Sequence, residues 1–156
     1  MKPNRLFFLL TLFVFSNVQA ADKFERDNVY VGGGIGFNSV GKGGDSIGFQ
    51  FLAGYDLEFP LADGVNSLVE VGYMDSGSFD NGGKATGFWG TGLATYRINK
   101  EILALGRIGL DIGDDSGLML GFGADYKLDK LKSVRGEIVK RDSIDSIQFN
   151  FTYKLN

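Results

Sequence analysis

The sequence contains no cysteine and no histidine among its 156 residues, and only two prolines. Without cysteine, an exported chain has no disulfide bonds, so its core or a closed sheet must stabilise it. After residue 20, no apolar run is long enough to cross a bilayer as a helix. If the chain enters a membrane, it must therefore do so as a β-barrel, in which every backbone group can be paired.

Residues 1–20 have the pattern of a secretory signal peptide. Lys2 and Arg5 supply positive charge, residues 6–15 are almost entirely apolar, and small side chains precede a cleavage position after Ala20. We predict one domain over residues 21–156. That part retains 14 of the 16 basic residues and all 19 acidic ones, a net charge of −5, which argues against nucleic-acid binding.

Glycine is abundant, with 24 residues, and it is interleaved with β-branched and aromatic side chains in a period-2 pattern. Such alternation predicts β-strands, and the glycines suit a tightly curved sheet. Eight segments show the pattern: residues 29–37, 47–59, 68–74, 86–98, 102–112, 118–128, 131–141 and 147–155.

One triplet recurs at the end of every second segment. It occurs as Tyr55-Asp56-Leu57, Tyr96-Arg97-Ile98, Tyr126-Lys127-Leu128 and Tyr153-Lys154-Leu155. Each copy places an aromatic and an aliphatic side chain on one face of a strand and a charge on the other. We interpret the four tyrosines as an aromatic girdle at a membrane–water interface.

The two faces of the segments differ in bulk as well as polarity. The apolar face carries large side chains, whereas the polar face is rich in glycine and other small residues, as a narrow barrel interior requires. A secreted soluble barrel of the lipocalin type would have the opposite arrangement. With the apolar face outward, Arg135 and Glu137 point inward; at the lipid midplane an arginine would cost about 2–4 kcal/mol.

The connections alternate in length. Short turns are expected at residues 99–100 and 129–130, with a longer turn at 59–66. The other connections fall at residues 39–45, 75–83, 113–116 and 142–143. This arrangement predicts an all-β fold, an eight-stranded antiparallel up-and-down transmembrane β-barrel with its short turns in the periplasm.

Six charged residues are expected inside the barrel: Glu70, Arg107, Asp111, Asp125, Arg135 and Glu137. They could form a gate whose ion pairs exchange partners, or a fixed salt-bridge network that fills the lumen. We favour the fixed network, because eight strands enclose only enough room for side chains and buried charges must be paired.

Other possible sites are weaker. Asp111, Asp114 and Asp115 could hold Ca²⁺ or bridge to lipopolysaccharide phosphates, but their spacing fits no known calcium loop, and we favour a solvated rim. The glycine run at residues 32–36 lacks the spacing of a nucleotide-binding loop. We predict no catalytic residue, no metal site and no cofactor.

With these features the chain resembles the small eight-stranded outer-membrane barrels, the family that includes the transmembrane domain of outer membrane protein A and outer membrane protein X. The matching segments are residues 30–34, 53–55, 69–73, 135–137 and 149–155. The resemblance implies insertion into the outer membrane by the barrel insertion machinery, which reads the last strand. That strand usually ends in an aromatic residue, whereas this chain ends in Leu155-Asn156.

The resemblance also bears on activity. The enzymes among outer-membrane barrels depend on a histidine base, which this chain lacks, so we expect no enzyme. We expect a monomer with a structural or surface-interaction role that contacts lipopolysaccharide. A small porin-like channel is the alternative. An adhesin ranks lower because the loops are short, and a soluble lipocalin-like carrier would require the opposite face assignment.

Overall fold

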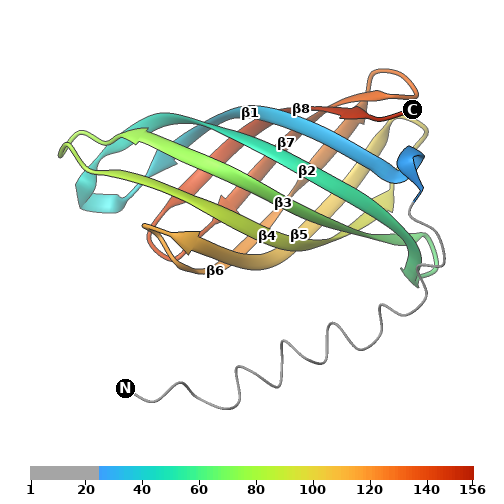
Figure 1. Cartoon of the computed structure of the whole chain (residues 1–156), viewed down its shortest axis with the longest axis horizontal. Helices are drawn as coiled ribbons and strands as arrows, with labels where there is room; N and C mark the ends of the chain where they lie inside the picture. Colours follow the sequence, from blue (N-terminus) through green and yellow to red (C-terminus); the bar gives the residue numbers. More distant parts are fainter. Residues whose placement is uncertain (1–24) are drawn as a thin grey trace, which may run out of the picture.

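The computed structural model describes residues 25–156, so the expected signal peptide and its cleavage position lie outside the described residues. Eight strands form one closed barrel (Figure 1). Their bounds are β1 (Val29–Ser39), β2 (Asp45–Ala62), β3 (Val65–Ser78), β4 (Lys84–Arg97), β5 (Ile102–Gly113), β6 (Gly117–Lys127), β7 (Lys132–Lys140) and β8 (Asp145–Lys154). Two short 3-10 turns, η1 (Arg26–Asn28) and η2 (Gly41–Gly43), precede β1 and β2. In the described part of the chain, no helix is long and apolar enough to cross a membrane.

Each strand pairs antiparallel with its neighbours in sequence, and β1 closes the barrel against β8. The strands are staggered, so a path of paired residues around the barrel does not return to its start. The path runs Val29, Tyr55, Val69, Gly92, Ile108, Leu120, Lys140, Asp145 and Ser39. It meets β1 again ten residues further along, and such stagger is linked to strands that tilt against the barrel axis.

The two ends of the barrel differ less in the length of their connections than the sequence predicts: two to four residues at one end and three to five at the other. Both β1's start and the chain's C-terminus lie at one end, with the connections at residues 63–64, 98–101 and 128–131; we call this the turn end (Figure 1). The other, the loop end, has the connections at residues 40–44, 79–83, 114–116 and 141–144. The predicted strand count and topology are therefore confirmed.

Several strand limits differ from the sequence-based expectation. β3 runs to Ser78 and β4 begins at Lys84, so residues 75–78 of the loop expected at 75–83 belong to β3 and residues 79–83 remain a loop. The ladder continues there because Asp75 forms an ion pair of 2.8 Å with Lys84, and Gly77, at φ 75°, accommodates a bulge. The polar composition of this segment concealed the pairing.

The longer turn expected at residues 59–66 is also different. β2 continues through Pro60 to Ala62, and only Asp63 and Gly64 turn the chain. Two register shifts lie between Asp56 and Ala62, and Glu58 adopts a φ of 52°. Proline fits here because β1 begins opposite Tyr55, so the rest of β2 has no partner on that side.

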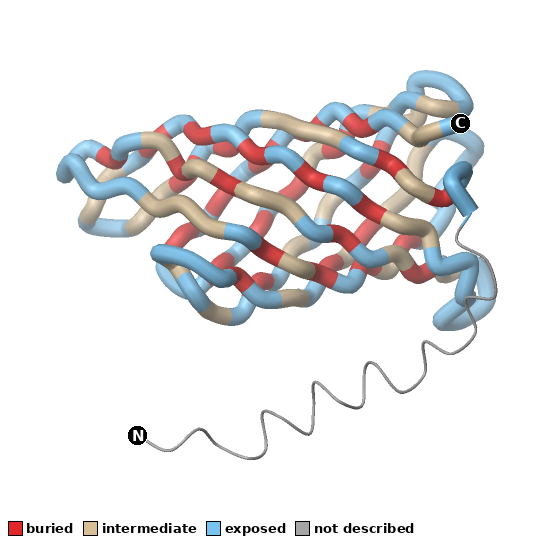
Figure 2. Tube along the Cα trace, in the orientation of Figure 1, coloured by how far each residue is buried: buried red, intermediate tan, exposed pale blue. Residues whose placement is uncertain are grey.

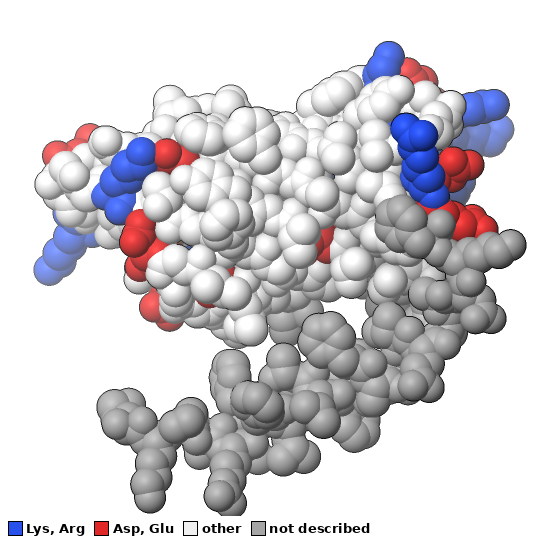
Figure 3. Space-filling model, viewed as in Figure 1, with Lys and Arg blue, Asp and Glu red and all other residues white. Residues whose placement is uncertain are grey.

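Burial alternates along the strands with the period of the side chains (Figure 2). In the described residues, 28 large hydrophobic side chains are exposed and only 10 are buried. Figure 3 shows charges gathered at the two ends of one face, with a mostly uncharged belt between them. The apolar face is thus on the outside, as predicted.

Glycines on the inner face let neighbouring strands and their side chains pack closely. An added Cβ at Gly34 would lie 2.0 Å from the backbone oxygen of Phe149 and 2.4 Å from Oδ1 of Asn150. On the outer face, by contrast, a Cβ at Gly92 would have nothing within 4 Å. Only the inward glycine is required by close packing.

Candidate functional site

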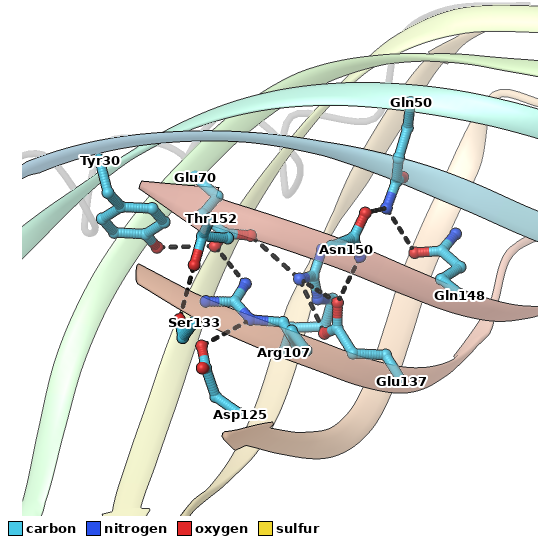
Figure 4. Close-up of polar contacts among 11 residues, drawn as sticks. Tyr30, Gln50, Glu70, Arg107, Asp125, Ser133, Glu137, Gln148, Asn150 and Thr152 are labelled. Atoms are coloured by element: carbon cyan, nitrogen blue, oxygen red, sulfur yellow. Dashed lines mark hydrogen bonds and ion pairs between the residues drawn. The ribbon is translucent and has the colours of Figure 1, made fainter. Parts of the chain in front are cut away.

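The centre of the lumen holds a charge cluster built around Glu70 of β3, which is 1% exposed (Figure 4). Its Oε1 accepts hydrogen bonds from Tyr30 Oη at 2.6 Å and Arg135 Nη1 at 2.5 Å. Its Oε2 accepts a hydrogen bond from Arg107 Nη2 at 3.0 Å. One carboxylate thus joins β1, β5 and β7 across the barrel.

The two arginines link Glu70 to further acids. Arg107 Nη2 lies 2.7 Å from Glu137 Oε1, and Arg135 Nε donates to Asp125 Oδ2 at 3.1 Å. Both guanidinium groups also lie over aromatic rings. Arg107 is 5.3 Å from the ring centre of Trp89, and Arg135 is 5.9 Å from that of Tyr30. All five charges are buried and each has an oppositely charged partner, as buried charges require.

The structure divides the six charges predicted for the lumen. Glu70, Arg107, Asp125, Arg135 and Glu137 form one cluster, whereas Asp111 pairs with Arg141, just beyond the end of β7. Sequence reasoning did not assign Arg141 or Tyr30 to the network. A period of two puts both positions on the inner face, but it gives no sign of their partners across the lumen.

Uncharged polar side chains extend the cluster toward the loop end. Gln50 Nε2 donates to Gln148 Oε1 at 2.9 Å and to Asn150 Oδ1 at 2.7 Å, and Asn150 Nδ2 contacts Glu137 Oε2 at 3.4 Å (Figure 4). Asn150-Phe151-Thr152 has the form of a glycosylation sequon, but Asn150 is 1% exposed inside the barrel and is therefore not accessible.

At the loop end of the lumen, apolar side chains share the interior with the Asp111–Arg141 pair and with other buried polar groups. Met119 and Val139 are fully buried there, and Ile144, from the loop after β7, packs into the same cluster. Phe79, from the loop after β3, joins them, together with Met74 of β3. We call these five residues the apolar plug. Sequence reasoning missed it, because two of its members come from segments that otherwise have loop composition.

The turn end of the lumen is open and polar. A cavity of about 180 Å³, which we call the vestibule, extends inward there as far as Tyr30 and Arg135. Asp129, on its rim, accepts hydrogen bonds from the backbone N–H of Leu131 at 2.7 Å and of Lys132 at 2.9 Å. The bond from Leu131 is the main reason that the pKa of the Asp129 carboxyl lies below its ordinary value.

The four tyrosines predicted as a girdle lie on the outside, near the turn end, with Tyr96, Tyr126 and Tyr153 exposed and Tyr55 half-buried. The pairing path that contains Tyr55 crosses β4, β6 and β8 at Gly92, Leu120 and Asp145. Tyr96, Tyr126 and Tyr153 lie four, six and eight residues from these crossing points, on the side of the turn end. A stagger of ten residues over eight strands requires about 2–3 residues for every two strands. The register therefore keeps the tyrosines within about two residues of one depth.

The acidic rim is engaged within the loops. Asp114 Oδ2 accepts from Thr86 N at 2.9 Å, and Asp115 Oδ1 accepts from Ser143 N at 3.0 Å, while Asp111 lies inside the barrel. Within residues 25–156, no group of three histidine, cysteine, aspartate or glutamate side chains is placed to hold a metal ion.

Comparison by sequence found no protein-family model that matches the chain. A search of curated proteins also found no match.

Comparison by structure places the chain among small barrels. A de novo designed transmembrane β-barrel superposes with a TM-score of 0.63 at 15% identity, over 85% of this chain and 99% of that one. Neisserial surface protein A gives 0.57 at 12% identity, over 82% and 97%. Ail, the attachment invasion locus protein of Yersinia pestis, gives 0.55 at 11% identity, over 81% and 95%. At these identities the likeness concerns the fold, and the chain has the fold of the small eight-stranded barrels that its sequence resembles.

Proposed function

We propose that this chain is an integral outer-membrane β-barrel with a structural or surface-interaction role, exported through a signal peptide cleaved after Ala20. The observation that carries the proposal is the reversal of polarity across the barrel wall. Exposed apolar side chains surround a closed sheet, while charged side chains fill its interior. Water on the outside would make this arrangement unfavourable, whereas lipid makes it stable.

The orientation follows from the two ends. The tyrosines belong on the periplasmic side, together with connections of two to four residues. The loop end, with connections of three to five residues, faces outward, where it contacts lipopolysaccharide. Folding and insertion depend on the barrel insertion machinery. Every strand edge is paired within the one barrel, so a monomer is sufficient to span the membrane.

We expect neither catalysis nor conduction from this barrel. The chain has no histidine to serve as a base. Burial of Glu70 and Arg107 in the central cluster, together with the apolar plug, argues against a water-filled path and so against the porin-like alternative. Eight-stranded barrels of this kind have interiors filled by side chains.

Cell fractionation combined with gel mobility tests the membrane location. We expect the mature chain in the outer-membrane fraction, with a band that migrates differently before and after boiling. Recovery of the chain as a soluble periplasmic protein without detergent would overturn the proposal and favour the lipocalin-like arrangement.

Planar bilayer recording tests the closed lumen. We expect no stable conductance steps from the refolded barrel. Steps that disappear in the Glu70→Gln variant would contradict the closed lumen and establish the channel alternative.

A further inference from the structure

The vestibule at the turn end carries an excess of positive charge. Five basic and three acidic side chains line it: Lys127, Lys130, Lys132, Arg135 and Lys154, with Asp56, Asp125 and Asp129. The remaining lining includes Asn28, Tyr30 and Thr152, whose polar groups border the same space.

Each of the three acids of the vestibule already has a hydrogen-bond or ion-pair partner. Asp125 is bonded to Arg135 at 3.1 Å, and Asp129 accepts two backbone hydrogen bonds and lies 3.6 Å from Lys132. Asp56 accepts a hydrogen bond from the backbone N–H of Glu58 at 3.0 Å. They leave other cations of the vestibule without a direct partner.

Three of the five basic residues are those cations: Lys127, Lys130 and Lys154. Lys130 is exposed, so the two inside the vestibule are Lys127 and Lys154. Both are half-buried, and in the described chain no carboxylate oxygen lies within 4.0 Å of either ammonium group. Arg97 and Lys154 are electrostatic neighbours of Lys127, and so are Asp125 and Asp56, beyond ion-pair distance. Because Asp125 is already bonded to Arg135, the three cations on this side of the vestibule outweigh the nearby acids. Partly desolvated cations near one another are unfavourable unless an anion lies between them.

The vestibule is also blind. Its inner wall is formed by Tyr30 and Arg135, and both are held by Glu70. An anion that enters from the turn end would therefore stop beside Lys127 and Lys154 and would not pass through the barrel.

We propose that the vestibule binds a phosphate-bearing anion between Lys127 and Lys154. A phosphate group offers several acceptor oxygens to separate ammonium groups, and lysine binds it as a point charge without a fixed geometry. A cavity of about 180 Å³ has room for the phosphate and for a small organic group attached to it. Soluble phosphate compounds and lipid headgroups share this chemistry.

The test titrates inorganic phosphate into the refolded barrel in octyl glucoside micelles, which contain no phosphate, and follows backbone amide resonances. We expect saturable shifts at Lys127 and Lys154. The Lys127→Gln/Lys154→Gln variant should bind at least about tenfold more weakly, since each lysine supplies a charged hydrogen bond. Lys100→Gln is the matched control, because Lys100 is exposed at the same end but does not line the vestibule.

A second arm identifies the source of the phosphate. The same resonances are compared between octyl glucoside micelles and phosphatidylglycerol nanodiscs. Lysine-dependent shifts with inorganic phosphate support a soluble ligand, and lysine-dependent shifts only in nanodiscs support a headgroup. The proposal fails if neither arm gives lysine-dependent shifts, or if Lys100→Gln weakens binding as much as the double variant. Heat-modifiable gel mobility of each variant shows that the barrel is folded, so this outcome is independent of where the protein resides in the cell.

Discussion

The inner and outer faces of the barrel wall are built from the same eight strands, yet they differ in the kinds of side chain that they tolerate. Each strand contributes alternate residues to both faces, so the two environments are separated by one peptide unit. On β6, Asp125 is buried beside Arg135, while its neighbour Tyr126 is exposed. A one-residue slip of any strand would exchange the two environments, which strongly specifies the register.

The faces also differ in how they are stabilised. The inner face depends on specific partners. The single side chain of Glu70, for example, contacts Tyr30, Arg107 and Arg135. The outer face makes few directed contacts and depends on the medium around it. Inner-face substitutions should therefore be sensitive to chemistry and shape, and outer-face substitutions to depth in the membrane.

The largest expected effect is on the inner face. Glu70→Ala removes one partner from both Arg107 and Arg135, and breaking a buried ion pair in this way costs about 3–5 kcal/mol. Urea unfolding in lipid vesicles measures the change, with Trp89, the only tryptophan, as the fluorescent reporter. Lys140→Ala breaks an exposed pair with Asp145 and should cost at most about 1 kcal/mol. Equal costs would mean that the central cluster contributes no more to the free energy of unfolding than an exposed ion pair.

The next effect tests the outer face by depth. Phe122, in the middle of β6, is 63% exposed, and Phe122→Arg would place a charge at the centre of the apolar belt at a cost of about 2–4 kcal/mol. Leu128 is similarly exposed, at 54%, but lies beyond Tyr126 at the turn end. Leu128→Arg should cost about 0–1 kcal/mol. If both variants unfold at the same urea concentration, the outer face does not sense a membrane.

The sequence predicted the faces better than the contacts. Alternation placed Glu70, Asp111 and Arg135 on the inner face, because period 2 is a local property of a strand. It could not pair Asp111 with Arg141, since these residues come from β5 and the end of β7 and meet only through the stagger of the whole sheet. Which charges face each other across a lumen is a property of closure.

The ends of the strands were also beyond local reasoning. The segment that contains Asp75 and Gly77 has loop composition, yet pairing with β4 keeps it extended. In the same way Phe79 and Ile144 have no periodic neighbours, and only the folded loops bring them together in the apolar plug. These features depend on contacts between distant segments.

The same substitution, glycine to alanine, can be compared on the inner and the outer face. Gly34→Ala adds an inward Cβ that would collide with backbone and side-chain atoms of β8, and such overpacking costs about 1–3 kcal/mol. Gly92→Ala adds the same atom on the outer face with open space around it, so it should leave stability unchanged or slightly raised. The pair is compared by urea unfolding in the same vesicles. A neutral Gly34→Ala variant would show that the inner face can relax.

The smallest expected effect comes from two nearly isosteric substitutions, threonine to valine on the inner face and valine to threonine on the outer face. Ser133 and Thr152 share a hydrogen bond of 2.7 Å on the inner face, and Thr152→Val removes it at a cost of about 1 kcal/mol. Val134, next to Ser133 on β7, is exposed on the outer face, where Val134→Thr would place a hydroxyl against lipid. We expect both variants to unfold at lower urea concentration, although one loses a hydroxyl and the other gains it. In a barrel surrounded by water Val134→Thr would be nearly neutral, so this variant alone separates the two media.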